Sequence, residues 1–383
     1  MSSVAPHSHL PYGEEGCAFY SEHTQGCFQV IESSCDLVWR AMQKVLLVNQ
    51  ERRFLSVADF GANDGGTSTF LWKQIFGNIR RDYPDLPIWL HYEDQATNDW
   101  KSLFLLVHGL VKAADSSSMI SIKKLFNNVS VSCCGTSFYE LCFPPCSLQF
   151  IYSATAMHWL ASPLEVKIKD AVHCAASKDS KVKEIIKKQA AKDWECNLLH
   201  RAKELAPGGQ MVLVNLGMDE DGQYLGNTRN NPVNIFQKFF DLWSALKDNE
   251  RITQEEFDNT CFANYYRTCD EIKEPFRDEN SPVCTAGLRL CSVEVKHIPC
   301  TYRSYLETHK DMDSKEFALW YVPTLRTWSN STFYNALSHD RSAEERSNIV
   351  DELFDAYTKE VQQNPFQHGM DYIHTHVHIE KIV

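Results

Sequence analysis

Apolar residues recur along the first half of the chain with two different periods, which alternate from residue 54 to residue 217. Five short apolar runs are typical of buried strands, and longer segments with helical spacing lie between them. The predicted strands are residues 54–60, 87–92, 129–133, 148–153 and 210–216, and the predicted helices are residues 67–81, 99–112 and 181–206. Strands that alternate with helices predict an α/β fold, in which a parallel sheet carries helices on both faces.

The second half of the chain breaks this rhythm. Residues 218–285 and 304–366 are rich in aromatic side chains and helix formers, so we interpret them as helical insertions that cover the sheet. Residues 287–298 and 372–382 alternate with a period of two, and we expect them to complete the sheet.

Three histidines follow one face of the last predicted strand, because His374, His376 and His378 occupy alternate positions. Three imidazoles in this arrangement could bind zinc. A row of this kind is more often the solvated face of a strand whose other face packs inward, here through Ile373 and Val377. We therefore expect solvent-exposed imidazoles and no metal.

The composition and the net charge exclude several classes of protein. Of the 383 residues 43% are hydrophobic, enough for a substantial core, which excludes a disordered or fibrous chain. The net charge of −12 disfavours a nucleic acid partner, because binding to phosphates depends on basic side chains. No apolar run approaches the roughly 20 residues of a membrane span, and the polar N-terminus lacks the apolar core of a signal peptide. We therefore expect a cytoplasmic protein without membrane contact, whose 14 cysteines stay reduced.

A glycine-rich turn follows the first predicted strand. This strand ends with Asp59 and Phe60 and leads into the segment Gly61-Ala-Asn-Asp-Gly-Gly66. Glycine lets the backbone approach a ligand closely, and the following helix begins where a nucleoside cofactor can bind. A dinucleotide site prefers the pattern G-x-G-x-x-G, from which this turn departs. Asp59 would repel a pyrophosphate, but it suits the sulfonium and amino groups of S-adenosylmethionine.

Four segments, in this order, resemble the SABATH family of S-adenosylmethionine-dependent methyltransferases. They are residues 58–67, 93–104, 135–144 and 153–160. The third is similar to the family pattern G-S-F-Y-x-x-L-F-P, and the fourth is similar to S-x-x-x-L-H-W-L. Members of the family methylate small carboxylic acids and, in some cases, ring nitrogens. The similarity extends from Tyr20 to the C-terminus and is loose after residue 218.

This resemblance implies a Rossmann-like class I methyltransferase sheet with helices on both faces and an α-helical cap. The expected regions are an N-terminal segment that closes over substrate and cofactor (1–53), the S-adenosylmethionine-binding core (54–217), two helical cap insertions that bind substrate (218–286 and 304–366) and C-terminal strands that complete the sheet (287–303 and 367–383). The resemblance also implies a homodimer.

The resemblance assigns residues to the cofactor as well. Asp59 would lie by its methionine end, and Asp94 would accept hydrogen bonds from the ribose hydroxyls. Ser137 and Phe138 would flank the adenine ring. The residues assigned to the cofactor are Tyr20, Asp59, Gly61, Asn63, Gly65, Asp94, Gln95, Ser137 and Phe138.

The methyl acceptor is expected near Trp159, because an indole N–H can hold a carboxylate but has no lone pair that competes for the methyl group. In the family a glutamine shares this task. Here Cys27 stands at that position, His23 replaces an asparagine, and Thr155 stands where many members have an aromatic residue. We expect His158 and Trp159 to orient the substrate, without any catalytic side chain. The residues assigned to the substrate are Tyr20, Cys27, Thr155, His158, Trp159, Trp320, Tyr321 and Tyr372.

The expected reaction is methyl transfer from S-adenosylmethionine to the carboxylate of a small acid, which gives a methyl ester and S-adenosylhomocysteine. A carboxylic acid with a pKa of about 4.3 is ionised at neutral pH, so the reaction needs alignment and exclusion of water but no general base. Two alternatives stay open: an N-methyltransferase for small amines or heterocycles, with His158 as the first candidate base, and a homologue that binds the cofactor without catalysis. A third alternative is an NAD-dependent oxidoreductase, against which the glycine spacing argues.

Overall fold

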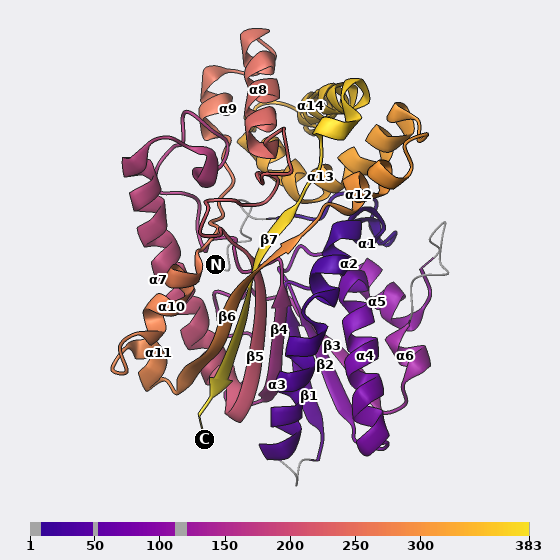
Figure 1. The fold of residues 1–383 in the computed structure, drawn as a ribbon, viewed down its shortest axis with the longest axis vertical. Helices are drawn as coiled ribbons and strands as arrows, with labels where there is room; N and C mark the ends of the chain where they lie inside the picture. The colour runs from indigo at the N-terminus through magenta and orange to yellow at the C-terminus, as the bar shows by residue number, and fades with distance from the viewer. Residues whose placement is uncertain (1–8, 49–52, 112–120, 383) are drawn as a thin grey trace.

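The computed structural model describes residues 9–48, 53–111 and 121–382, and its centre is a seven-stranded sheet with the strand order β3-β2-β1-β4-β5-β7-β6 (Figure 1). The strands are β1 (Leu55–Phe60), β2 (Ile88–Glu93), β3 (Val129–Cys134), β4 (Leu148–Ala154), β5 (Leu205–Leu216), β6 (Leu288–Ile298) and β7 (Tyr372–Lys381). The first five strands pair in parallel, whereas β7 runs antiparallel to both of its neighbours, β5 and β6. The predicted α/β fold is confirmed.

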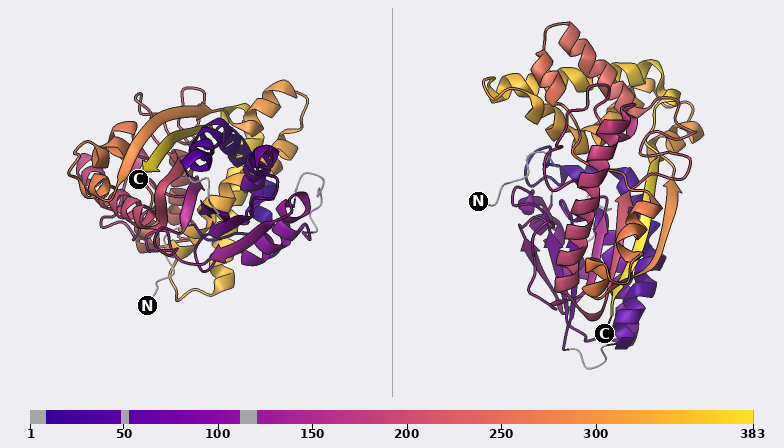
Figure 2. Two further views of the ribbon diagram at one scale, coloured as in Figure 1. Left: turned by 90° about the horizontal axis from the view of Figure 1, so that it is seen from below. Right: turned by 90° about the vertical axis from the view of Figure 1, so that its left-hand side faces the viewer.

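Helices cover both faces of this sheet and one of its ends. They are α1 (Phe19–His23), α2 (Gln25–Glu32), α3 (Cys35–Val48), α4 (Gly66–Asp82), α5 (Trp100–His108), α6 (Ile122–Leu125), α7 (Ser180–Glu204), α8 (Ile235–Asp248), α9 (Gln254–Asn259), α10 (Cys269–Lys273), α11 (Pro282–Thr285), α12 (Thr301–Thr308), α13 (Ser314–Ala336) and α14 (Ala343–Gln363). One face carries α3 and α4, and α7 lies on the other side (Figure 1). The helices α8, α9, α12, α13 and α14 form a cap at the end of the sheet where the parallel strands terminate (Figure 2).

The fifth strand begins earlier than predicted. Its first residue is Leu205 rather than Gln210, and α7 ends directly before it. Leu205 pairs with Leu148, but the next pair joins Phe150 to Gln210, so residues 206–209 bulge out of the ladder. The Pro-Gly-Gly segment that predicts a separate turn is thus a bulge inside the strand.

Helix boundaries differ in two further places. The helix predicted over residues 99–112 is α5, which ends at His108 because Gly109 adopts a left-handed conformation with φ of 65°. Lys112, its predicted last residue, lies outside the described residues. The N-terminal region, for which no secondary structure is predicted, contains three helices between residues 19 and 48.

Part of the segment assigned to the helical cap lies elsewhere. Within residues 218–286, α8 and α9 belong to the cap. In contrast, α10 packs against β6, and α11 packs against β6 and α7, beside the sheet and away from the cap (Figure 1). Only part of this segment therefore stands where it can cover a site at the strand ends.

The prediction of a solvated face on β7 is wrong. His374 and His376 are fully buried and His378 is 6% exposed, because β7 lies inside the sheet, α2 packs on it and α3 packs on the neighbouring β5. Each imidazole has one polar partner: His374 contacts Thr155, His376 contacts Ser33 and His378 contacts Gln210. The row is a polar layer within the core.

Three broader features bear on the predicted class of protein. All fourteen cysteines are free thiols. No helix in the described part of the chain combines the length and the apolar character that crossing a membrane requires. Among the same residues, no three His, Cys, Asp or Glu side chains are grouped so that they could hold a metal ion.

Candidate functional site

A cavity lies where the parallel strands end, between the sheet, the N-terminal helices and the cap. It encloses about 1010 Å³ of space between atoms, part of it open to solvent. Ligands of open α/β sheets bind at this edge. Twelve of the residues predicted for cofactor or substrate line it: Tyr20, Cys27, Gly61, Asn63, Asp94, Gln95, Ser137, Phe138, Thr155, His158, Trp159 and Tyr372.

One end of the cavity is polar and is built by the loops after β1 and β2. The Asp94 carboxylate accepts hydrogen bonds from the backbone N–H groups of Asn63 and Gln95, both at 2.7 Å. Burial raises the pKa of Asp94 to about 6. Gly61 has φ of 70°, and a Cβ there would lie 2.2 Å from the Cβ of Ala156, so the loop after β1 can approach β4 only with glycine at this position. The remaining lone pairs of Asp94 can accept hydroxyl groups of a ligand.

Two residues predicted to contact the cofactor do not line the cavity. Asp59 is buried in the sheet, where its Oδ2 accepts a hydrogen bond from the indole of Trp72 at 2.9 Å, and burial raises its pKa to about 6. Gly65 precedes α4 with φ of 73°, and a Cβ there would point at Leu103 and Tyr92 rather than into the cavity. At both positions the contacts are therefore with the protein interior next to the loop after β1, and not with the cavity.

The predicted cap residues are also displaced from the cavity. Trp320 packs against Tyr302 at the outer part of α13, and Tyr321 is fully buried against Phe317. The residue of α13 that lines the cavity is Trp328, two helical turns after Tyr321. The resemblance pointed to the right region of the cap but not to the turn of α13 that faces the site.

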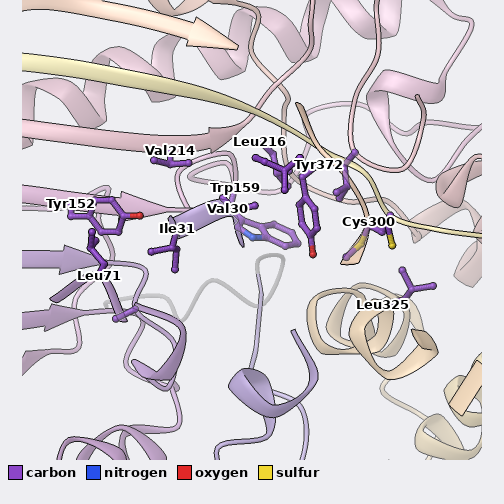
Figure 3. Packing of buried hydrophobic residues seen from close by; sticks show 14 of the residues in the cluster. Val30, Ile31, Leu71, Tyr152, Trp159, Val214, Leu216, Cys300, Leu325 and Tyr372 are labelled. Atoms are coloured by element: carbon purple, nitrogen blue, oxygen red, sulfur yellow. The ribbon is translucent and has the colours of Figure 1, made fainter. Parts of the chain in front are cut away.

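The other end of the cavity is aromatic and apolar. Trp159 lies in the loop after β4, where the hydroxyl of Tyr139 donates a hydrogen bond to its backbone oxygen at 2.6 Å. Figure 3 shows Trp159 and Tyr372 within the apolar cluster that runs from the sheet to the cap. The walls that sequence reasoning missed include Tyr139, Leu160, Leu225, Tyr266, Trp328 and Met370. Tyr139 and Leu160 carried a usable signal, because they lie within the third and fourth of the four motifs.

Polar groups in this aromatic end are uncharged. Burial, together with nearby His173 and Arg267, lowers the pKa of His158 to about 3, so its imidazole is neutral at physiological pH. Thr155 has φ of 54°, a strained backbone for a β-branched residue, and its Oγ1 lies 3.0 Å from Nε2 of His374. No lysine or arginine lines the cavity in the described part of the chain, and Asp94 is its one acidic residue there.

The N-terminal residues close the cavity from the remaining side. The hydroxyl of Tyr20 lies 3.6 Å from Sγ of Cys27. His9 lies further in, with its Nε2 at 2.8 Å from Nδ2 of Asn63 and its backbone oxygen accepting a hydrogen bond from the Gln95 side chain. Nothing in the sequence pattern pointed to His9, because it stands in a polar segment without periodicity.

Comparison with known proteins agrees with this arrangement. A family model described as SAM dependent carboxyl methyltransferase matches residues 8–382. Anthranilate O-methyltransferase 3 of Zea mays is 26% identical over 232 residues, which cover 57% of this chain and 59% of that protein. Probable jasmonic acid carboxyl methyltransferase 2 of Theobroma cacao is 25% identical over 178 residues, 43% of this chain and 46% of that protein. The chain thus spans about half the length of these curated relatives.

A solved structure shares the fold over the whole chain. The structure described as loganic acid methyltransferase with SAH aligns with a TM-score of 0.72 and covers 98% of this chain and 99% of that one. The sequence identity is 17%, so the likeness concerns the fold.

Proposed function

Because the chain belongs to the family of SAM dependent carboxyl methyltransferases, we propose that it transfers a methyl group from S-adenosylmethionine to the carboxylate of a small organic acid. The products are a methyl ester and S-adenosylhomocysteine. The observation that carries this proposal is a single cavity that joins a polar end at Asp94 to an aromatic end at Trp159, with no lysine or arginine among its described lining residues.

The polar end fits an adenosyl cofactor. Asp94 begins the loop after β2 and has acceptor capacity for two ribose hydroxyls, and Ser137 and Phe138 provide a polar contact and a flat face for an adenine. The Gly61 turn leaves the backbone accessible on the same side. When bound, S-adenosylmethionine supplies a methyl group attached to a positively charged sulfur.

The aromatic end fits an acid that needs no activation. A free carboxylate is ionised at neutral pH, so the protein has to position it and exclude water. The aromatic walls at Tyr139, Tyr266 and Trp328 serve both purposes. A protonated amine would need a base, and His158, with a pKa lowered to about 3, is a poor one. The site therefore favours an acid over an amine.

The proposal is tested by incubating the purified protein with methyl-labelled S-adenosylmethionine and a panel of benzoate, salicylate, jasmonate and small amines. Label that enters a base-labile ester of one of the acids supports the proposal. Label found only in the amines would replace it with N-methylation. Binding of S-adenosylhomocysteine by calorimetry, without transfer to any panel member, would identify a non-catalytic homologue.

Substitution of Asp94 by asparagine is expected to weaken S-adenosylhomocysteine binding by about 1.5–3 kcal/mol, or roughly 10- to 150-fold, as for a lost hydrogen bond to a charged group. The affinity of the wild type should also fall as the pH drops through about 6, because Asp94 then takes up a proton. Calorimetry at pH 7.5 and 5.5 measures both effects. The exposed Asp85→Asn variant is the matched control, and equal affinity of the two variants would contradict the ribose role.

Replacement of Trp159 by phenylalanine is expected to raise the KM of the acid about 10-fold and to leave cofactor affinity unchanged, since the indole N–H is lost from a site that remains aromatic. Steady-state kinetics and calorimetry separate the two quantities. Trp89→Phe, on the exposed part of β2, serves as the control. A parallel loss of acid and cofactor binding would mean that Trp159 is a packing residue.

We also propose an oligomeric state, a class of partner and a location for the protein. The resemblance to the family supports a homodimer, which sedimentation of the purified protein measures. The net charge of −12 supports a small acid rather than a nucleic acid as partner. We also propose a cytoplasmic location, which microscopy of the tagged chain tests.

A further inference from the structure

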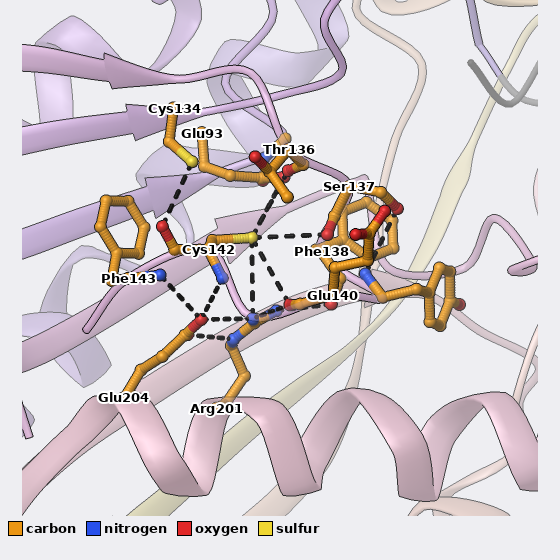
Figure 4. Close-up of polar contacts among 12 residues, drawn as sticks. Glu93, Cys134, Thr136, Ser137, Phe138, Glu140, Cys142, Phe143, Arg201 and Glu204 are labelled. Atoms are coloured by element: carbon orange, nitrogen blue, oxygen red, sulfur yellow. Dashed lines mark hydrogen bonds and ion pairs between the residues drawn. The ribbon is translucent and has the colours of Figure 1, made fainter. Parts of the chain in front are cut away.

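Two cysteines flank the loop after β3, which contributes Ser137 and Phe138 to the cavity. Cys134 is the last residue of β3, and residues 135–141 separate it from Cys142. A side-chain hydrogen bond joins the two thiols, and Sγ of Cys134 lies 3.3 Å from the backbone oxygen of Cys142 (Figure 4). Both side chains are partly exposed. The fold therefore brings two accessible thiols together beside the polar end of the cavity.

The hydrogen bond makes the two thiols chemically unequal. Hydrogen bonds from the Cys142 thiol and from Thr136 lower the pKa of Cys134 to about 6, although burial opposes this shift. The bond to Cys134, together with burial, raises the pKa of Cys142. Two charged groups of opposite sign face the pair, since Oε1 of Glu93 and Nη2 of Arg201 lie 4.0 and 3.8 Å from Sγ of Cys142. At neutral pH Cys134 thus carries the reactive thiolate and Cys142 keeps its proton.

The neighbouring Cys133 lacks these features. Successive side chains of a strand point to opposite faces of the sheet, so Cys133 points away from the side on which Cys134 meets Cys142. Burial raises the pKa of Cys133 to about 12, which keeps its thiol protonated. Cys133 is therefore a matched control for Cys134 on the same strand.

We propose that Cys134 and Cys142 form a modification site, at which hydrogen peroxide converts the two thiols into a disulfide. The Cys134 thiolate attacks one oxygen of the peroxide, the O–O bond breaks, and a sulfenic acid forms while the departing hydroxide takes up a proton from solvent. The Cys142 sulfur then attacks the sulfenic sulfur, and the S–S bond forms as the Cys142 proton and the sulfenic hydroxyl group leave as water. The two cysteines lose two electrons, which reduce the peroxide to two molecules of water.

The disulfide is expected to disturb the adenine end of the cavity, a consequence that rests on the proposed function. In the reduced protein, Sγ of Cys142 lies 3.4 Å from the backbone oxygens of both Thr136 and Ser137. Oxidation removes the thiol proton that Cys142 can donate to these oxygens and brings the two sulfur atoms to about 2.05 Å from each other. The loop must then change shape, which displaces Ser137 from its place in the cavity wall.

Proteolysis after Glu140 maps the disulfide, because this residue lies between the two cysteines. The full chain is oxidised with hydrogen peroxide, its remaining thiols are alkylated, and the fragments are identified by mass spectrometry. The fragments that contain Cys134 and Cys142 are expected to stay joined until dithiothreitol is added. Cys134→Ser and Cys142→Ser should each abolish this link, and Cys133→Ser should keep it. A link that survives in either of the first two variants, or no link in a wild-type sample whose exposed Cys17 is oxidised, would overturn the proposal.

Calorimetry with S-adenosylhomocysteine measures the consequence for the cofactor. Peroxide is expected to weaken binding by the wild type about 10-fold, as for a lost hydrogen bond, and dithiothreitol should restore it. The same treatment should change the affinity of Cys134→Ser less than twofold, whereas Cys133→Ser should respond as the wild type does. If the linked protein binds as tightly as the reduced one, the effect on the cofactor is refuted while the proposed function stands. If the reduced wild type binds no S-adenosylhomocysteine, the proposed function fails, and the proteolytic map still decides whether the disulfide forms.

Discussion

Substitution of Arg201 by methionine is expected to lower the free energy of unfolding by about 3–5 kcal/mol and to weaken cofactor binding, although Arg201 does not line the cavity. Arg201 is fully buried on α7 and pairs with Glu204 one turn later, with Nε at 2.6 Å from Oε2. Its guanidinium also donates to the backbone oxygens of Phe138 and Glu140, at 2.7 and 2.9 Å (Figure 4). Phe138 lines the cavity. Loss of Arg201 should therefore affect both the stability of the fold and the position of Phe138 in the site.

The expected loss is large because methionine would leave several buried groups without partners. The Glu204 carboxyl group would keep only the N–H groups of Cys142 and Phe143 as donors. The carbonyl groups of Phe138 and Glu140 would lose their donors as well, and each buried group left unpaired costs roughly 1–3 kcal/mol. The loop between these residues should then become mobile and hold the adenine less well.

Urea unfolding measures the stability effect, and calorimetry with S-adenosylhomocysteine measures the effect on the site. Lys188→Met is the control, since Lys188 and Glu184 form an exposed pair on the same helix and such pairs contribute at most about 1 kcal/mol. The double variant Arg201→Met/Glu204→Leu should recover part of the stability, because no unpaired charge remains. A single variant as stable as Lys188→Met would show that the buried pair is not needed to hold the loop.

The central sheet could be predicted from the sequence because each of its strands is a short apolar run that can be recognised locally. The first four strands, such as β1 with its run from Leu55 to Phe60, were found within a residue of their observed limits. The start of the fifth strand could not be predicted in this way, because its first residue, Leu205, joins the strand by pairing with Leu148 across a bulge. The helices of residues 19–48 were not predicted, and α3 packs closely on the sheet, where tertiary contacts stabilise a helix more than its own propensity does.

The candidate site could be predicted where a residue sits in a short motif at a strand end. Asp94 and Trp159 are of this kind, because the carboxyl ends of parallel strands meet at one edge. Asp59 belongs to the same class of motif, yet its side chain points toward Trp72 of α4, which strand periodicity alone does not decide. The cap residues were least predictable: which turn of α13 faces the cavity depends on how α13 packs against α14 and α1, and this put Trp328 there instead of Trp320.

The histidines of β7 are expected to make stability depend steeply on pH. Burial, with a smaller contribution from Lys296, lowers the pKa of His376 to about 3, against an ordinary value of 6.5. Between these two values the folded protein holds His376 neutral, whereas the unfolded chain takes up a proton. The unfolded state therefore gains a proton as the pH falls, and its free energy drops relative to the folded state. The stabilisation is complete above pH 6.5 and is lost progressively toward pH 3.

One such group changes the free energy of unfolding by about 1.4 kcal/mol per pH unit within that window. His378, with a pKa lowered to about 4, and His374, whose pKa is also lowered, act in the same direction. Asp59 and Asp94 act in the opposite direction, since burial raises their pKa values to about 6 and the folded protein then binds their protons more tightly. Comparing a variant that lacks one histidine with the wild type isolates the contribution of that histidine to the pH dependence of the free energy of unfolding.

His376→Gln keeps a polar side chain beside Ser33 but removes the titrating group. Urea unfolding at pH 7.5, 6 and 5 is expected to show a slope that is smaller than that of the wild type by about 1.4 kcal/mol per pH unit below pH 6. His309→Gln, at an exposed position after α12, is the control and should reproduce the wild-type slope. If the His376→Gln slope equals that of the wild type, water reaches this face of β7 and the imidazole is already protonated in the folded protein. A reduced slope would establish that the sheet holds an uncharged histidine layer directly beneath the Thr155 end of the cavity.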